Sequence, residues 1–120
     1  EQSALPSYER AFEVLQSSPN ENLFVAELNG EIVGTFQLVV LTKLTGQGCR
    51  TLMVQSVQTK SKYRGQGIGS KMIEFAVEFA KSRDCKAVQL MSNSTRIDAH
   101  RFYSRIGFQP THTGFRMVLK

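Results

Sequence analysis

Apolar residues recur every three or four positions in three parts of this chain, which is the period of a helix with one buried face. The first segment, Leu5–Leu15, has Leu5, Tyr8, Phe12 and Leu15 on one stripe. The second, Ile68–Arg83, has Ile68, Met72, Phe75, Phe79 and Ala80. The third includes Ala99, Phe102, Tyr103 and Ile106, and Gly107 follows it as a left-handed cap would. The pattern predicts three amphipathic helices.

Shorter runs rich in β-branched and aromatic residues predict strands between these helices. Asn29-Gly30, a strong hairpin signal, separates the first two runs. A loop from Thr42 to Arg50 leads to the third. The predicted strands are Leu23–Leu28, Glu31–Leu41, Thr51–Thr59 and Ala87–Met91, with a last strand pair in Phe108–Leu119 that turns near Thr113-Gly114. This order of elements predicts a mixed α/β layer fold.

Composition limits the class of protein. The 120 residues, 41% of them hydrophobic, predict a single domain, 1–120, with a packed core. No run approaches the roughly 20 apolar residues of a membrane span, and the acidic start at Glu1 is unlike a signal peptide. Cys49 and Cys85 lack metal-site spacing, which favours free thiols in the cytoplasm. A net charge of +5, spread along the chain without a basic tail, favours anionic ligands.

A glycine-rich turn, Tyr63-Arg64-Gly65-Gln66-Gly67-Ile68-Gly69, lies between a predicted strand and a predicted helix. Such a turn leaves several backbone N–H groups unpaired and pointing the same way. The helix dipole adds partial positive charge at the same place. The turn therefore predicts a site for a phosphate or pyrophosphate, with Arg64 at its rim.

Known phosphate-binding patterns fit this turn unequally. The nucleotide-triphosphatase loop ends in Gly-Lys-Ser/Thr, whereas the order here is Gly69-Ser70-Lys71. The dinucleotide fingerprint needs G-x-G-x-x-G and an acidic residue after the next strand, whereas that strand leads into Met91-Ser92-Asn93. A purely structural turn without a ligand remains an open alternative on the motif alone.

Three motifs together resemble the GNAT family of N-acetyltransferases. Arg64-x-x-Gly67-x-Gly69 is similar to its acyl-CoA motif, R/Q-x-x-G-x-G/A. Ala99-His100-Arg101-Phe102-Tyr103-x-x-x-Gly107-Phe108 resembles its second signature, and Asn29-Gly30-Glu31-Ile32-Val33-Gly34 its common hairpin. The resemblance covers about residues 23 to 119. Asp98 to Tyr103, with His112, is also similar to the aminoalkylphosphonate N-acetyltransferases of this family.

The resemblance implies a mostly antiparallel central sheet flanked by helices, and transfer of an acetyl group from acetyl-CoA to the primary amine of a small molecule or, as the weaker option, a peptide. The pyrophosphate would be held by the turn: Arg64, Gly65, Gln66, Gly67, Ile68, Gly69 and Ser70. The pantetheine amides would pair with a strand edge at Val57, Gln58 and Thr59, one of whose N–H groups would stabilise the oxyanion.

The remaining site residues that the resemblance implies lie towards the C-terminus. Tyr103 would give a proton to the departing thiolate, although an aromatic on a helix stripe is also an ordinary core residue. Phe102 would line the cofactor channel through its backbone or simply pack. Asn93 would bind the cofactor or cap the following helix.

The chain departs from the family pattern in two places. Gln55 stands where many relatives carry a glutamate as general base, and an amide cannot take up a proton. His112 is a candidate base on chemistry alone, but a lone histidine near a C-terminal strand is more often structural, so the base is left unassigned. Only one helix is predicted before Leu23, so we also expect the family's first strand and helix to be missing from this chain.

Two other classes of function compete with acetyl transfer. A nucleic-acid-binding module would explain the positive charge, but basic residues are not clustered with aromatics and no nucleic-acid-binding signature occurs. A non-catalytic acyl-CoA sensor would keep the turn and dispense with the base. We therefore expect a small-molecule amine as partner, no nucleic acid, no membrane and no metal, and a homodimer is compatible with the family.

Overall fold

The computed structural model describes residues 10, 13 and 16–120. Leu5, Tyr8, Phe12 and Leu15, on which the predicted first helix rests, lie outside the described residues. The chain divides into a first compact unit that ends at Leu90 and a second that runs from Met91 to Lys120.

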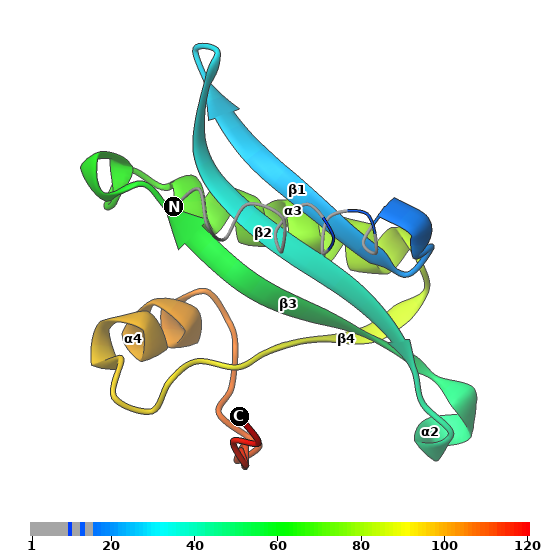
Figure 1. Ribbon diagram of the computed structural model, residues 1–120. Helices are drawn as coiled ribbons and strands as arrows, with labels where there is room; N and C mark the ends of the chain where they lie inside the picture. The colour runs from blue at the N-terminus through cyan, green and yellow to red at the C-terminus, as the bar shows by residue number, and fades with distance from the viewer. Residues whose placement is uncertain (1–9, 11–12, 14–15) are drawn as a thin grey trace. The chain divides into compact units, whose positions relative to one another are not determined.

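The first unit is built on a four-stranded sheet with the order β1-β2-β3-β4 (Figure 1). Its strands are β1 (Glu21–Leu28), β2 (Glu31–Thr42), β3 (Arg50–Thr59) and β4 (Cys85–Leu90). The pairs β1–β2 and β2–β3 are antiparallel, and β4 runs parallel to β3. The hairpin predicted at Asn29-Gly30 is confirmed. Both residues have positive φ, 52° and 82°, as the tight turns between twisted strands require.

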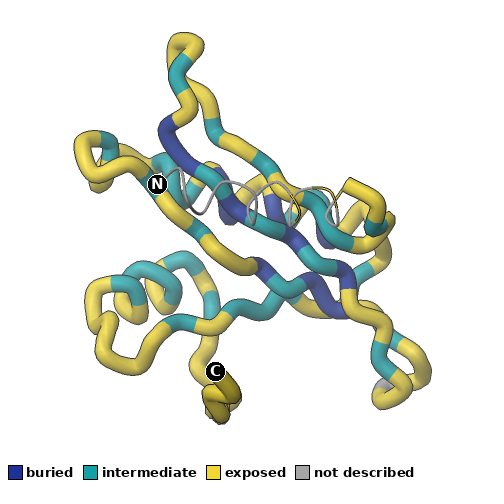
Figure 2. The backbone as a smooth tube through the Cα atoms, viewed as in Figure 1, coloured by how far each residue is buried: buried dark blue, intermediate teal, exposed yellow. Residues whose placement is uncertain are grey.

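Helix α3 (Ile68–Ser82) connects β3 to β4 and packs on one face of the sheet, as Figure 1 shows. The core lies between this helix and the central strands β2 and β3, where the buried segments concentrate in Figure 2. Alternate residues of β2 point to the helix, as expected for a strand with one buried face. The buried apolar residues are Val33, Phe36, Leu38 and Val40 of β2, Leu52 and Val54 of β3, and Met72, Ile73, Ala76 and Ala80 of α3.

An aromatic cluster joins the hairpin to α3. Phe24 stacks on Phe36 across the strands, with ring centroids 5.5 Å apart. The ring of Phe75 meets Phe24 edge-on at 4.8 Å, and that of Phe79 meets it at 5.6 Å. The predicted helix stripe is therefore correct, although Phe75 covers the rim of the core and is 46% exposed.

The β2–β3 connection, predicted as a loop, contains the single-turn helix α2 (Thr45–Gly48). In the second unit, α4 (Ile97–Arg105) confirms the third predicted helix, and Gly107 has φ 112° after it. The strand pair predicted in Phe108–Leu119 is wrong: the structure has no strand from Met91 to Lys120. Its alternating apolar residues find no neighbouring strand to pair with in that unit, and Phe115, Met117 and Leu119 are exposed.

Both cysteines, Cys49 and Cys85, are free thiols. Among residues 10, 13 and 16–120, no helix is long and apolar enough to cross a membrane. In the same described part, no three histidine, cysteine or acidic side chains gather as metal ligands would.

Candidate acetyl-donor site

The C-terminal half of β3 is unpaired on the side where β4 lies. The parallel ladder between these strands ends at the pair Val54–Leu90, whereas β3 continues to Thr59. The predicted edge residues Val57, Gln58 and Thr59 all lie in this extension. Their backbone groups on that side have no strand partner within the described sheet. An extended ligand could therefore add to β3 as a further strand would.

A β-bulge lies in the same part of β3. Its register with β2 slips between Thr35 and Gln37, so that Ser56 and Val57 together oppose Phe36. Ser56 has φ 54°, a left-handed conformation that is uncommon for residues other than glycine. Bulges bend a strand and redirect its backbone groups, and they often occur beside functional sites. This bulge turns the extension of β3 just before the glycine-rich turn.

Local hydrogen bonds shape the turn that follows β3. A 3₁₀ turn, Ser61–Tyr63, leads into it. The Arg64 Nε donates to the Thr59 carbonyl at 3.3 Å, and the Gln66 Nε2 donates to the Lys62 carbonyl at 3.1 Å. Gly65 and Gly67 have φ of 79° and 85°, and a Cβ on either would meet nothing within 4 Å. These positions favour glycine for its backbone conformation and not for lack of space.

The N-terminus of α3 presents free amide groups to this turn. The hydrogen bond that closes the first helical turn runs from the Lys71 N–H to the Gly67 carbonyl at 3.1 Å. The N–H groups of Ile68, Gly69 and Ser70 thus precede the helical ladder. No side chain caps this end of α3, and its first turn holds no acidic residue. Open amides and a helix dipole together suit an anion.

The basic side chains around the turn differ in whether an acidic side chain lies beside them. Lys60 forms an ion pair with Glu31 at 3.2 Å, and Lys71 lies 4.0 Å from Glu74 on the helix surface. Arg64 has no acidic partner among the described residues, and its Nε bond to a carbonyl leaves its charge uncompensated. The residues from Arg64 to Ser70 therefore lie together at the N-terminus of α3, where Arg64 adds a positive charge that is unpaired among the described residues.

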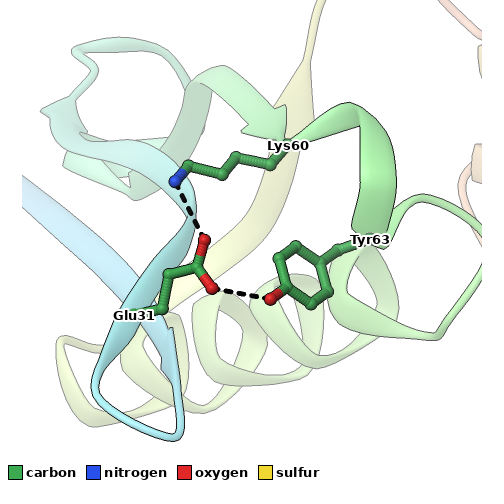
Figure 3. Close-up of polar contacts among 3 residues, drawn as sticks. All are labelled: Glu31, Lys60 and Tyr63. Atoms are coloured by element: carbon green, nitrogen blue, oxygen red, sulfur yellow. Dashed lines mark hydrogen bonds and ion pairs between the residues drawn. The ribbon is translucent and has the colours of Figure 1, made fainter.

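A carboxylate from the β1–β2 hairpin holds the start of this turn (Figure 3). Glu31 accepts a hydrogen bond of 2.6 Å from the Tyr63 hydroxyl and pairs with the Lys60 ammonium through its other oxygen. The bond from Tyr63, and next that from Lys60, lower the pKa of the Glu31 carboxyl. Sequence reasoning missed this group because Glu31 lies 29 positions from Lys60 and 32 from Tyr63, and no local pattern links residues that far apart.

The other predicted site residues lie in the second unit. Tyr103 of α4 is partly buried, with its ring edge-on to Phe102 at 5.3 Å and to Phe108 at 5.8 Å. Burial raises the pKa of its hydroxyl, and nearby Arg96 opposes that rise in part. The hydroxyl forms no hydrogen bond with any residue that the structure describes. Tyr103 is therefore packed through its ring while its polar end is unengaged.

Asn93 serves the turn before α4. Its Oδ1 accepts hydrogen bonds from the Thr95 backbone N–H at 3.0 Å and from the Thr95 hydroxyl at 2.7 Å. Its carbonyl lies 2.9 Å from the His100 Nε2. The N-cap residue of α4 is Arg96, and no described side chain caps this helix. The alternative that Asn93 caps the helix is therefore wrong. A short side chain that bonds two residues ahead stabilises a turn instead.

Two further residues, Gln55 and His112, bear on the identity of the general base. Gln55 of β3 is exposed and pairs across the ladder with Gln37. The His112 Nδ1 lies 2.6 Å from the Thr111 hydroxyl on the surface. The Gln55 amide cannot take up a proton, and His112 contacts its sequence neighbour Thr111, so the geometry leaves the general base unassigned.

The positive charge is less evenly spread along the chain than we predicted from the sequence. The second unit contains five basic residues and one acidic residue, Asp98, so its net charge is +4 of the +5 carried by the whole chain. Its basic residues are Arg96, Arg101, Arg105, Arg116 and Lys120. Arg96 acts electrostatically on Tyr103, and the Arg105 guanidinium lies over the Phe102 ring. The second unit as a whole is cationic.

Comparison with known proteins shows the family and the fold of this chain. Residues 2–108 match the family model described as the acetyltransferase (GNAT) family. An aminoalkylphosphonate N-acetyltransferase of Salmonella typhimurium is 33% identical over 106 residues, which cover 84% of this chain and 65% of that enzyme. The chain spans between 40% and 65% of the length of the curated relatives that it matches.

Solved structures share the fold. One, described as a transcriptional regulator from Bacillus halodurans, is 42% identical with a TM-score of 0.91, and the match covers 94% of this chain and 75% of that one. An Agrobacterium tumefaciens protein described as an acetyltransferase is 29% identical with a TM-score of 0.84, covering 91% of this chain and 76% of that one.

Proposed function

The chain belongs to the GNAT family of acetyltransferases, and on that basis we propose that it moves the acetyl group of acetyl-CoA to a primary amine. One observation carries the proposal. The unpaired extension of β3 leads directly through a glycine-rich turn to the uncapped N-terminus of α3. This order offers a strand edge and then an anion site, which matches an extended pantetheine arm that ends in a pyrophosphate.

The donor-binding residues follow from this arrangement. The amides from Gly65 to Ser70, together with Arg64, Gln66 and the turn backbone, would hold the pyrophosphate. The edge at Val57, Gln58 and Thr59 would bind the pantetheine amides, and one of its N–H groups would polarise the acetyl carbonyl. Asn93 and Phe102 are also proposed as cofactor contacts. The free Asn93 side-chain nitrogen and the Phe102 backbone are the groups available for this.

Tyr103 is the proposed proton donor. Acyl transfer from a thioester releases a thiolate, which needs a proton, and a phenol is a suitable general acid. Burial keeps the Tyr103 hydroxyl protonated by raising its pKa, and the absence of a hydrogen-bond partner among the described residues leaves that proton available. Gln55 cannot accept the proton of an ammonium substrate. Loss of that proton to solvent before attack is therefore the proposed route. The second proton, which the nitrogen loses as the amide forms, restores the Tyr103 hydroxyl after it has protonated the thiolate.

An anionic amine is the proposed acceptor class. The second unit is strongly cationic, and Arg101 and Arg116 have no acidic partner within it. Guanidinium groups bind phosphonate and phosphate in a two-pronged geometry. The name of the Salmonella relative, an aminoalkylphosphonate N-acetyltransferase, points to the same class. A small amine that bears a phosphonate or phosphate is thus favoured over a polyamine or a peptide.

A thiol-release assay with acetyl-CoA tests both statements. The panel should contain aminoalkylphosphonates, the alkylamines of the same length without the phosphonate, polyamines and peptide N-termini. We expect CoA release above the amine-free rate, with kcat/KM highest for the phosphonates. Release with the plain alkylamines at equal kcat/KM would contradict the anionic acceptor alone. No release with any amine would contradict the transferase.

A non-catalytic acyl-CoA sensor is the second candidate. Gln55 in place of the family's glutamate favours it, and so does the B. halodurans neighbour, whose name is that of a transcriptional regulator. A sensor would bind acetyl-CoA, seen as a rise in melting temperature, and release no thiol.

We also propose that the acetyltransferase is located in the cytoplasm and assembles as a homodimer. Imaging of the tagged chain and sedimentation would test them.

A further inference from the structure

Glu31 places a negative charge beside a site that the proposed function assigns to an anion. It is the first residue of β2, directly after the Asn29-Gly30 turn, and it lies far in sequence from the glycine-rich turn. Its carboxylate contacts Tyr63, which immediately precedes Arg64. By charge alone, a carboxylate in this position would weaken the binding of a pyrophosphate. A role other than charge is needed to explain its place.

The contacts of Glu31 fasten the entrance of the turn to the hairpin. Its two carboxylate oxygens are both used, one by the Tyr63 hydroxyl at 2.6 Å and one by the Lys60 ammonium at 3.2 Å (Figure 3). The Lys60 backbone N–H also donates to the Val33 carbonyl at 2.8 Å. Three hydrogen bonds thus join residues 60–63 to the start of β2. The short bond to Tyr63 has an ionised acceptor, which makes it stronger than a bond between neutral groups.

These bonds stabilise a segment that has few other side-chain hydrogen bonds. Beyond Tyr63, the turn has only two local side-chain bonds, from Arg64 and Gln66, and two left-handed glycines. Glycines give a chain more conformational freedom than other residues do. An anchor at the entrance reduces the number of conformations that the following amides can adopt, and a ligand then loses less entropy when it binds.

We propose that Glu31, acting through Tyr63 and Lys60, is a positioning residue that holds the glycine-rich turn in its anion-binding form. This inference rests on the proposed function, because the ligand it concerns is the CoA pyrophosphate. In this proposal Glu31 acts on the turn and makes no contact of its own with the ligand. Its effect is on donor affinity, and the chemical step at saturating donor is unaffected by it.

Charge and positioning predict opposite signs for the same variant. Removal of the carboxylate in Glu31→Ala relieves electrostatic repulsion and would tighten CoA binding if charge were the whole effect. If the anchor matters more, Glu31→Ala weakens CoA binding, roughly fivefold for the loss of a pair of exposed hydrogen bonds. Tyr63→Phe, which keeps the charge and the ring, weakens it to a similar degree. In Glu31→Gln an amide oxygen still accepts from Tyr63, so affinity recovers in part.

The experiment measures the Kd of CoA and the kcat of acetyl transfer for wild type, Glu31→Ala, Glu31→Gln and Tyr63→Phe. The matched control is Glu78→Ala, which removes a similar exposed ion-paired carboxylate, from the Lys81 pair on α3. We expect a higher Kd with unchanged kcat in the Glu31→Ala and Tyr63→Phe variants, and no change in the control. Equal or tighter binding by Glu31→Ala would overturn the proposal, as would a fall in kcat alone.

Amide hydrogen exchange of the ligand-free protein separates this inference from the proposed function. We expect faster exchange in residues 64–70 of Glu31→Ala than of wild type or of Glu78→Ala, with the exchange of the core strand β2 unchanged. If wild type fails to bind CoA but the exchange result holds, the proposed function is wrong and the anchor stands. If wild type binds CoA and exchange is unaffected by Glu31→Ala, the anchor is wrong.

Discussion

Gly34 of β2 lies against Met72 of α3 so closely that a side chain on the glycine would displace its neighbours. A Cβ built at this position would be 3.2 Å from the Met72 sulfur and 3.0 Å from the Gln58 carbonyl oxygen. The helix and the bulged part of β3 thus approach the same backbone position. Gln58 belongs to the strand edge that we assign to the donor, so Gly34 lies between that edge and the core residue Met72.

The first prediction concerns this approach. We expect Gly34→Ala to destabilise the fold by about 1–3 kcal/mol, as an overpacked core does, because the Gln58 carbonyl is backbone and moves less readily than a side chain. Urea unfolding measures the change. Thr35→Ala, on the neighbouring residue that is not fully buried, serves as the control and should cost less. An unchanged midpoint for Gly34→Ala would show that the contact is slack.

The sequence predicted most of the first unit because its signals are local. Asn29-Gly30 needs only its own backbone to specify a hairpin, and the stripe that contains Met72 and Ala80 needs only the helical period. The glycine-rich turn was located for the same reason, since closely spaced glycines between a strand and a helix indicate a turn without reference to any distant residue. Gly34 belongs to the hairpin motif, and its close approach to Met72 explains why a residue without a side chain occupies this position.

Features that depend on distant partners were missed or misread. The Glu31–Tyr63 bond joins residues 32 positions apart, and no local pattern marks such a pair. Phe115 and Met117 alternate as in a strand, yet a strand forms only where another pairs with it, and the second unit provides none. The bulge at Ser56 is equally invisible, because a non-glycine residue at positive φ carries no compositional signal.

The second prediction tests the turn as an anion site. Gly67 has φ 85° and open space around its Cα, so Gly67→Ala brings no clash but disfavours the left-handed conformation by about 1–2 kcal/mol. If the amides must hold that conformation to bind CoA, the Kd should rise by roughly 5- to 30-fold. Isothermal titration with CoA measures this.

Gly48→Ala is the matched control for the turn. Gly48 has φ 78° at the end of α2 and a single neighbouring atom, the Lys43 carbonyl oxygen at 3.9 Å. The backbone cost is similar, but the residue lies outside the proposed site. Both variants should lose comparable stability, and only Gly67→Ala should lose affinity. An equal loss of affinity in the two would assign the effect to general destabilisation.

The third prediction is a pH dependence of stability that arises from Glu31. Its pKa is lowered from 4.5 by the hydrogen bonds from Tyr63 and Lys60, with smaller help from the charges of Lys62 and Lys60. A lowered carboxyl pKa stabilises the folded state above the unfolded value, and this contribution is lost as the pH falls through the folded value. The stability difference between wild type and Glu31→Gln should therefore shrink from about pH 7 towards about pH 3. A difference that stays constant over that range would contradict the ion pair.

The fourth prediction separates catalysis from binding at Tyr103. Tyr103→Phe keeps the ring that packs against Phe102 and Phe108 and removes only the hydroxyl. If that hydroxyl protonates the thiolate, kcat should fall by about 100-fold or more, the usual contribution of a general acid, while the Kd of CoA stays near its wild-type value. Ser104→Ala, which removes the hydroxyl of the exposed neighbouring residue, is the control and should leave both constants unchanged.

The pH profile of kcat provides a further test of the same role. Because burial raises the Tyr103 pKa above its ordinary value of 10.0, the phenol keeps its proton throughout the neutral and mildly alkaline range. A general acid is active in its protonated form, so Tyr103 should cause no fall in wild-type kcat below about pH 10. An alkaline fall near about pH 8 or 9 that disappears in Tyr103→Phe would mean that the phenol ionises early, contrary to its buried setting. A fall that persists in Tyr103→Phe would belong to another group, and the assignment of Tyr103 would then depend on the loss of kcat alone.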